Sequence, residues 1–246
     1  MNRRLVFATF VVVVMIALAG CTDFLGPRAI SESDLDETAE YDWETDAAAT
    51  ITFDGDSEYR AIYDVDTETF EVYQTDRLNN DRHLNVRAVQ YRYPNGTVLN
   101  GSELSVETTR TATVITLPDD EGQVAYTAST PSKRFESPQL VDGSHEVILP
   151  PNHYVENILF GQVRPGGYET EQVGDRLHLS WNDGPGDQMR VHFYLQRDIY
   201  IFAGILGLVL ILSGGAAGRV YLQIRDLRRE RDELGLSLDI DDERSD

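Results

Sequence analysis

Cysteine and lysine are almost absent from this sequence of 246 residues, where each occurs once, as Cys21 and Lys133. A single cysteine excludes an internal disulfide framework and any metal site built from several cysteines. Basic residues are scarce as well. The sequence has 21 Lys and Arg residues and 42 Asp and Glu residues, which gives a formal net charge of −21. Such a surface repels nucleic-acid phosphates, so the composition argues against a general DNA- or RNA-binding function.

The acidic residues are spread along the chain rather than gathered in one tail. This distribution, with arginine in place of nearly all lysine, is typical of a surface that works in concentrated salt. At ~1 M salt the screening length falls to about 3 Å, which removes most of the repulsion between carboxylates. A cation-collecting surface is the functional alternative, but no group of carboxylates has metal-ligand spacing. The charge pattern therefore favours a halophilic protein.

The N-terminus has the pattern of a secretory signal peptide, residues 1–20. Arg3 and Arg4 precede a largely apolar stretch, residues 5–18, which is shorter than the ~20 residues of a membrane-spanning helix. The following Leu18-Ala19-Gly20-Cys21 resembles a lipobox, the recognition sequence of exported lipoproteins. That resemblance implies cleavage after Gly20 and a lipid on the Cys21 thiol. The alternative is an uncleaved signal anchor in which Cys21 is buried and inert.

A second apolar run, residues 199–217, contains no charged residue. A helix of that length covers ~28 Å at 1.5 Å per residue, close to the hydrocarbon thickness of a bilayer. More arginines follow this run than precede it, so the positive-inside rule places the C-terminus in the cytoplasm and residues 22–198 outside the cell. We therefore predict a transmembrane helix at 199–218 and a cytoplasmic basic helix with an acidic tail at 219–246.

Two glycines inside this span, Gly214 and Gly218, are four residues apart. Small residues at that spacing allow two membrane helices to approach closely. Glycine is also common in membrane helices for other reasons, so Gly214 and Gly218 are candidates for helix packing and no more.

Between the two membrane signals, the sequence predicts an acidic tether at 21–46 and a β-rich domain at 47–198. The runs 59–65 and 70–73 alternate apolar and polar residues on either side of a short polar turn, which predicts a hairpin. Six further strands are expected at 84–93, 111–117, 122–128, 144–149, 176–181 and 189–195.

No long amphipathic helix interrupts these strands, so a parallel βαβ architecture is not expected. We predict a mainly β fold, an extracellular antiparallel β-sandwich followed by one C-terminal transmembrane helix. The domain could also consist of two packed β-units that meet near residues 129–138.

Two N-glycosylation sequons, Asn95-Gly96-Thr97 and Asn100-Gly101-Ser102, lie on a segment predicted to be outside the cell. Asn95 and Asn100 are therefore candidate glycosylation sites. Asn-Gly is also a common hairpin turn, so a purely structural role for these residues is an equal alternative.

Motifs for catalysis or metal binding are missing from the sequence. The segment Asp54-Gly55-Asp56-Ser57-Glu58 begins like a calcium loop, but Tyr59 and Val65 occupy the positions of its turn glycine and bidentate glutamate. The histidines lack close metal-ligand spacing, and neither a serine elbow, a phosphate loop nor a zinc-protease motif is found. We therefore assign no catalytic residue, no metal ligand and no cofactor.

Several segments together resemble a family of haloarchaeal membrane lipoproteins that carries only a domain-of-unknown-function label. They are Leu18-Ala19-Gly20-Cys21, Glu40-Tyr41-Asp42-Trp43, Tyr91-Arg92-Tyr93-Pro94-Asn95-Gly96-Thr97, Val114-Ile115-Thr116-Leu117-Pro118, Arg164-Pro165-Gly166-Gly167-Tyr168-Glu169-Thr170 and Phe193-Tyr194-Leu195-Gln196-Arg197-Asp198. The resemblance spans nearly the whole chain and agrees with the halophilic charge pattern and with two membrane anchors. It implies no activity, substrate or catalytic residue.

These observations predict a non-enzymatic cell-surface lipoprotein, held in the membrane by a lipid on Cys21 and by the helix at 199–217. A domain held close to the bilayer is well placed to contact a membrane protein. We therefore expect an interaction or binding module, an accessory subunit of a membrane complex.

The alternative is a surface-tethered carbohydrate-binding or hydrolytic domain with a sugar-stacking face. The aromatic residues available for such a face are Tyr91, Tyr93, Tyr126, Trp181 and Tyr194. Aromatic residues on alternating strands more often form a core, and we favour that interpretation.

Overall fold

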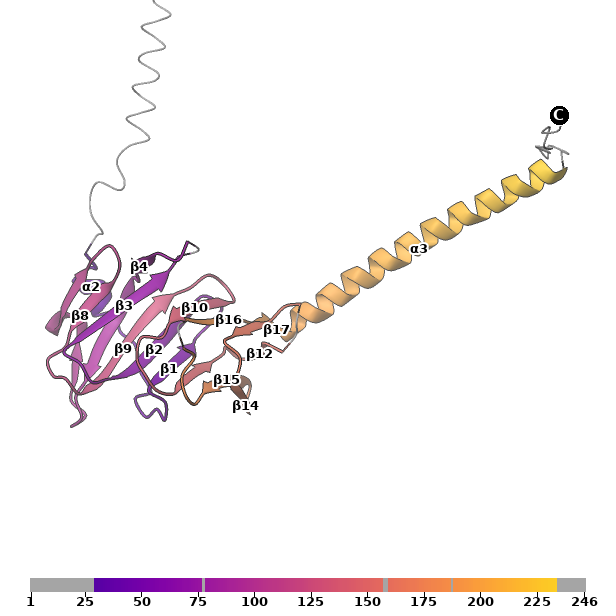
Figure 1. Cartoon of the computed structure of the whole chain (residues 1–246). Helices are drawn as coiled ribbons and strands as arrows, with labels where there is room; N and C mark the ends of the chain where they lie inside the picture. Colours follow the sequence, from indigo (N-terminus) through magenta and orange to yellow (C-terminus); the bar gives the residue numbers. More distant parts are fainter. Residues whose placement is uncertain (1–28, 77, 157–158, 187, 234–246) are drawn as a thin grey trace, which may run out of the picture. The chain divides into compact units, whose positions relative to one another are not determined.

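β-strands are the main secondary structure before residue 195 in the computed structural model, which describes residues 29–76, 78–156, 159–186 and 188–233. The strands form a β-domain that ends at Tyr194, and a long helix follows it (Figure 1). The predicted signal peptide, Cys21 and the acidic tail lie outside the described residues.

The largest sheet of the β-domain has eight strands in the order β14-β15-β11-β1-β2-β9-β5-β6. Their bounds are β1 (Ala49–Phe53), β2 (Glu58–Val65), β5 (Val86–Arg92), β6 (Val98–Asn100), β9 (Gly122–Ser129), β11 (His145–Ile148), β14 (Glu169–Val173) and β15 (Arg176–Trp181). Neighbouring strands are antiparallel except for β1 and β11, which pair in parallel. The mainly β prediction is confirmed, with one parallel pair that the sequence did not indicate.

Three smaller sheets complete the domain, in the orders β4-β3-β8-β7, β10-β16-β13 and β12-β17. Their strands are β3 (Thr69–Thr75), β4 (Asp81–His83), β7 (Ser105–Thr108), β8 (Thr113–Thr116), β10 (Arg134–Pro138), β12 (His153–Tyr154), β13 (Gln162–Arg164), β16 (Gln188–His192) and β17 (Tyr194–Leu195). Two short helical turns, α2 (Glu32–Leu35) and η1 (Gly101–Glu103), accompany them.

One hydrophobic core lies between the eight-stranded sheet and the smaller sheets. Ring contacts cross this interface, with 5.2 Å between the centroids of Tyr63 on β2 and Phe70 on β3, and 5.0 Å between Tyr59 on β2 and Phe135 on β10. Residues 129–138, the candidate boundary between two β-units, contain the end of β9, a turn and all of β10, and both strands contribute side chains to the same core.

The hairpin predicted for residues 59–65 and 70–73 is wrong, because β2 and β3 belong to different sheets. Strand β2 already pairs with β1 on one side and β9 on the other, so no free edge remains for β3. Ala61, Ile62 and Tyr63 are all buried, as expected of a central strand covered on both faces. The turn after β2 therefore carries the chain across to the second layer.

The described part of the C-terminal unit consists mainly of the helix α3 (Gln196–Glu233). Among the described residues it is the one helix that is long and apolar enough to cross a membrane, with a mean hydropathy of 2.2 in its apolar part. This confirms the predicted helix at 199–218. The predicted basic helix after it is the same helix, continued without a break to Glu233.

Candidate functional site

The first described residues pack against the β-domain, although the sequence predicted a tether for 21–46. Ser31 caps α2 by accepting a hydrogen bond from a backbone amide of its first turn, and Leu35 is buried in the core. Asp36 Oδ1 accepts a hydrogen bond from the backbone amide of Ser102 at 2.9 Å, and hydrogen bonds from the Ser102 side chain and backbone lower the pKa of Asp36. The tether prediction is therefore corrected for the part of the segment that the structure describes.

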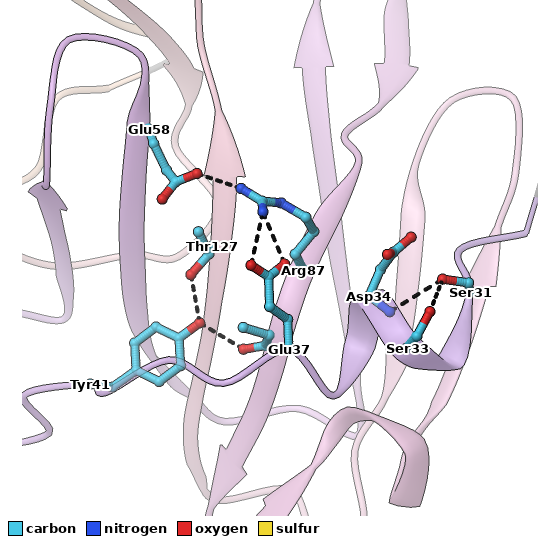
Figure 2. A network of polar contacts seen from close by, with 9 residues as sticks. Ser31, Ser33, Asp34, Glu37, Tyr41, Glu58, Arg87 and Thr127 are labelled. Atoms are coloured by element: carbon cyan, nitrogen blue, oxygen red, sulfur yellow. Dashed lines mark hydrogen bonds and ion pairs between the residues drawn. The ribbon is translucent and has the colours of Figure 1, made fainter.

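Tyr41 fastens the next stretch of this segment over a β-bulge. The register between β5 and β9 shifts between Arg87 and Gln90, and Ala88 within the shift has a φ of +49°. The Tyr41 hydroxyl donates a hydrogen bond to the carbonyl of Ala88 at 2.6 Å and lies 3.0 Å from Thr127 Oγ1 (Figure 2). Burial raises the pKa of Tyr41 far above its usual range, so the phenol remains a hydrogen-bond donor.

Arginine side chains on the sheet also hold the segment. Arg87 lies between two carboxylates, with Nη1 2.9 Å from Glu37 Oε2 and Nη2 2.5 Å from Glu58 Oε2 (Figure 2). The hydrogen bond to Glu58 is the main reason that the pKa of Arg87 is raised. Arg60 donates a hydrogen bond to the carbonyl of Glu40. These contacts fix the course of the chain up to Trp43.

From Trp43 onward the segment forms one wall of a groove with a volume of about 1090 Å³. The groove lies where β2 and β5 end and β9 begins, which is one end of three neighbouring strands. Its other walls come from the turn between β2 and β3 and from the loop between β10 and β11. Residue 122, at the start of β9, must be a glycine, because a Cβ there would lie only 2.5 Å from the Tyr91 hydroxyl.

Negative charge dominates the groove. Its lining contains seven carboxylates, Glu44, Asp46, Asp64, Asp66, Glu71, Glu121 and Asp142. Arg92 is the one basic side chain among the described residues that line it. Arg92 pairs with Glu44 at 3.2 Å, and the Gln123 amide donates to Asp64 at 2.9 Å. The other five carboxylates form no ion pair with any residue in the described ranges.

Aromatic rings lie beside these carboxylates. The Arg92 guanidinium carbon is 6.0 Å from the centroid of the Trp43 ring, within cation–π distance, and the Tyr41 ring is 5.6 Å from the same ring. Tyr93 meets the buried Tyr91 edge-on, at 5.0 Å between centroids. Trp43 and Tyr93 are both half-buried. Each therefore offers part of its surface to an occupant of the groove.

The residue types that line the groove suit the binding of a positively charged ligand. Serine, cysteine and histidine are not found among the described residues of its lining. No group of three or more His, Cys, Asp and Glu side chains is close enough to hold a metal ion within the described parts of the chain. Carboxylates beside aromatic surface are suited to arginine and lysine side chains, whose charged ends they pair and whose stems they cover.

Comparison with known proteins places the chain in a family. Residues 45–239 match a family of unknown function, DUF5803. The chain belongs to this family. The DUF5803 match includes every strand of the β-domain and all of α3, so the family combines the sandwich with the apolar helix. The haloarchaeal source and the lipid anchor that the resemblance implied stay predictions.

Other comparisons add little to the DUF5803 assignment. No curated protein matches the chain. Among solved structures, an M1 zinc metallopeptidase from Deinococcus radiodurans aligns at 10% identity with a TM-score of 0.32. The alignment covers 58% of this chain and 40% of the peptidase. Similarity at this level carries no argument about function.

The candidate glycosylation sites of this DUF5803 chain are exposed residues close to turns. Asn95 Oδ1 accepts a hydrogen bond from the amide of Thr97 at 2.9 Å, and Gly96 has a φ of +87°, which confirms the turn between β5 and β6. Asn100 precedes η1, where its backbone amide donates to Glu103 Oε2 at 3.0 Å. Glycosylation of either asparagine stays a prediction.

The remaining sequence candidates do not converge on the groove. Gly214 and Gly218 lie on α3, where no described atom comes within 4 Å of the position that a Cβ would take, apart from the backbone of the helix itself. Their role in helix packing stays a prediction. Cys21 lies outside the described residues.

The histidines of the chain are distributed over separate strands rather than gathered in one site. His178 Nδ1 is 2.8 Å from Glu146 Oε1 on the neighbouring strand, whereas His153 Nε2 is 3.1 Å from Asp56 Oδ1 in another part of the domain. His145 is buried, with Nδ1 3.0 Å from the carbonyl oxygen of Gly143.

Most residues considered for a sugar-stacking face belong to the core. Tyr91, Tyr126 and Trp181 are almost fully buried, as the core interpretation predicted. Trp43 lines the groove but is not among the aromatic residues that the sequence suggests for a binding face. The stretch around it was interpreted as part of a polar tether, although two aromatic residues within three positions are an unusual composition for a linker.

Proposed function

We propose that this DUF5803 chain is a non-enzymatic, membrane-anchored interaction module whose groove binds a basic segment of a membrane-protein partner. The supporting observation is the groove, with seven carboxylates and one guanidinium around about 1090 Å³. Arginine or lysine side chains of the partner would form charge-assisted hydrogen bonds with the carboxylates that lack an ion pair. Trp43 and Tyr93 would pack against the aliphatic stems of those side chains.

The apolar helix α3 supports the membrane anchor. The arginines that follow the apolar run favour a cytoplasmic C-terminus, which would put the β-domain and its groove outside the cell. A lipid on Cys21 would be the second anchor. Two anchors would keep the groove within reach of other proteins of the same membrane, as expected of an accessory subunit.

The salt of a halophilic environment restricts how such a groove can bind. At ~1 M salt, attraction between charges is screened within about 3 Å, so steering over longer distances is lost. Binding would then depend on direct hydrogen-bonded pairs and on aromatic packing, both of which act in contact. This is why we place the binding site in a groove that surrounds its ligand and not on the acidic surface as a whole.

Affinity purification tests the proposal. The full chain would be isolated from gently solubilised membranes in ~3 M salt and its partners identified by mass spectrometry. Three forms are compared: the unchanged chain, a groove variant with Asp66→Asn and Glu71→Gln, and a control with Glu169→Gln and Glu171→Gln on β14. We expect a stoichiometric partner with the unchanged chain and the control, and its loss with the groove variant.

The same experiment separates two ways in which the proposal can fail. If the groove variant keeps the partner, then the partner binds elsewhere and the groove assignment is wrong. If an intact and folded chain brings down no membrane protein at all, then the interaction module itself is refuted.

A carbohydrate ligand is the second candidate, because Trp43 and Tyr93 lie next to carboxylates in an open groove. Aromatic faces beside hydrogen-bond acceptors are the usual surroundings of a bound sugar. Binding of soluble oligosaccharides to the full chain, lost on Trp43→Ala and kept in the β14 control, would favour this candidate over a protein partner.

A further inference from the structure

An aromatic cluster surrounds the point where the chain leaves the β-domain. The ring of Tyr194, the last residue of that domain, is 6.0 Å from the ring of Phe160 and 6.5 Å from the ring of Tyr154, measured between centroids. Leu159, next to Phe160 in the chain, has 75% of its surface exposed. The cluster therefore combines one buried ring, Tyr194, and two half-buried rings, Tyr154 and Phe160, with an exposed aliphatic side chain.

Covalent connection holds this cluster near the start of the apolar run of α3. Tyr194 is two residues before Gln196, the first residue of α3, and the apolar run begins at Ile199. Two residues of extended chain reach at most ~7 Å, and three helical steps add about 4.5 Å. The backbone of Tyr194 is thus at most about 12 Å from the start of the apolar run, whatever angle the helix takes to the domain.

Chemical composition supports a lipid neighbour for this surface. A hollow of about 550 Å³ has Leu159, Phe160 and Arg164 in its lining, together with a single carboxylate, Glu156, among the described residues. Aromatic and aliphatic tips with an arginine nearby are typical of protein surfaces at the membrane interface, where rings lie among the headgroups and guanidinium groups reach phosphate oxygens. The acidic groove, by comparison, has seven carboxylates in its lining.

We propose that Leu159 and Phe160 form a lipid-contacting tip that enters the interface of the bilayer crossed by α3, with Tyr154 and Tyr194 at headgroup level. This inference rests on the membrane anchoring proposed above, but it does not depend on what the groove binds. The tip adds a third contact with the membrane.

Spin labels on the full chain in vesicles of phosphatidylcholine and phosphatidylglycerol test this proposal. Three single-cysteine variants, each with Cys21→Ser, carry the label at Leu159→Cys, Leu78→Cys or Leu208→Cys. Leu78 is a matched control, because it is an exposed leucine of the same domain, at 82%, outside the aromatic cluster. Leu208 reports on the apolar part of α3. Collision rates with oxygen and with a water-soluble nickel chelate give the depth of each label.

We expect the label at residue 159 to meet oxygen several-fold more often, relative to nickel, than the label at residue 78. The label at 208 should show the strongest preference for oxygen. If residue 208 lies in hydrocarbon while residue 159 matches residue 78, then the tip is refuted and the anchor stands. If residue 208 is also in water, then the anchor fails and the tip fails with it. Unchanged circular dichroism of each variant serves as the folding control.

Discussion

The two ends of strand β2 differ in what surrounds them. At its start, Tyr59 packs against Phe135 at 5.0 Å, and Phe53, which pairs with Tyr59, lies 5.2 Å from Phe193. At its end, Val65 lines the groove of carboxylates. Eight residues of strand place these surroundings ~23 Å apart. The start of β2 is surrounded by buried aromatic rings, whereas the groove at its end is lined by seven carboxylates. If the groove binds a partner as proposed, folding and binding depend on opposite ends of this strand.

The largest effect is expected at the aromatic end. Phe135→Ala removes a ring that is 1% exposed and contacts two other rings, so we expect a loss of about 3–5 kcal/mol in the free energy of unfolding. Phe135→Leu should cost much less. Glu71→Gln in the groove should change stability by no more than about 0.5 kcal/mol. Denaturant unfolding of the full chain in micelles and molar salt measures all three, and equal effects at both ends would refute the comparison.

A second effect is expected at the groove end when salt is withdrawn. Lowering the salt from ~3 M to ~0.1 M lengthens the screening distance to about 10 Å, so carboxylates that share the groove repel one another. The unchanged chain should lose stability. A variant with Asp46→Asn, Asp66→Asn, Glu71→Gln and Asp142→Asn should lose less, by about 1–2 kcal/mol. A circular dichroism titration measures this difference, and equal stability of the unchanged chain at both salt concentrations would remove the halophilic argument.

Strands were predictable where one face is buried. Strand β15 was predicted to the residue because Leu177, Leu179 and Trp181 alternate with polar residues and are all buried. Strand β14 was missed because its five residues are all exposed, so no apolar alternation marks them. It exists as a strand because β15 supplies hydrogen-bonding partners at the sheet edge. Alternation of apolar and polar residues indicates that one face of a strand is buried. It does not indicate that an exposed edge strand is paired with its neighbour.

The groove could not be predicted because no local segment contains it. It combines residues 43–46, the turn after β2 and the loop at 139–142, which the sandwich brings to one end of the sheet. The wall formed by Trp43 depends on hydrogen bonds from Arg60 and Arg92 to backbone carbonyls of the N-terminal segment, and such bonds leave no periodic signal. The acidic composition was visible in the sequence, but its concentration in one groove was not.

A smaller effect is expected for the attachment of the N-terminal segment to the sheet. Tyr41→Phe leaves the carbonyl of Ala88 without the hydrogen bond that the bulge of β5 receives, at a cost of about 0.5–1.5 kcal/mol. The segment should then detach more often, which limited proteolysis near residue 41 would detect as faster cleavage. The exposed Tyr200 of α3 offers a control, because Tyr200→Phe should leave cleavage unchanged. If Tyr41→Phe also leaves the rate unchanged, then the other contacts of the segment, such as the salt bridges of Arg87, hold it without the Tyr41 hydrogen bond.

The smallest effect is expected from the titration of His145, at a buried position remote in sequence from both ends of β2. Burial lowers the pKa of His145, so the unfolded chain takes up a proton at a higher pH than the folded domain does. The stability that this histidine contributes is complete above its unfolded pKa of about 6.5 and declines as the pH falls toward the folded value. One proton limits the slope to about 1.4 kcal/mol per pH unit.

His145→Asn keeps a donor for the carbonyl of Gly143, which accepts from Nδ1 at 3.0 Å, but it cannot titrate. Thermal unfolding at pH 7.5, 6.5 and 5.5 should therefore show a shallower decline for the variant than for the unchanged chain. His192, whose pKa is also lowered by burial, accounts for part of the decline that remains. Parallel curves for the two proteins would mean that His145 keeps its proton equilibrium on folding, and that acid acts on the domain elsewhere.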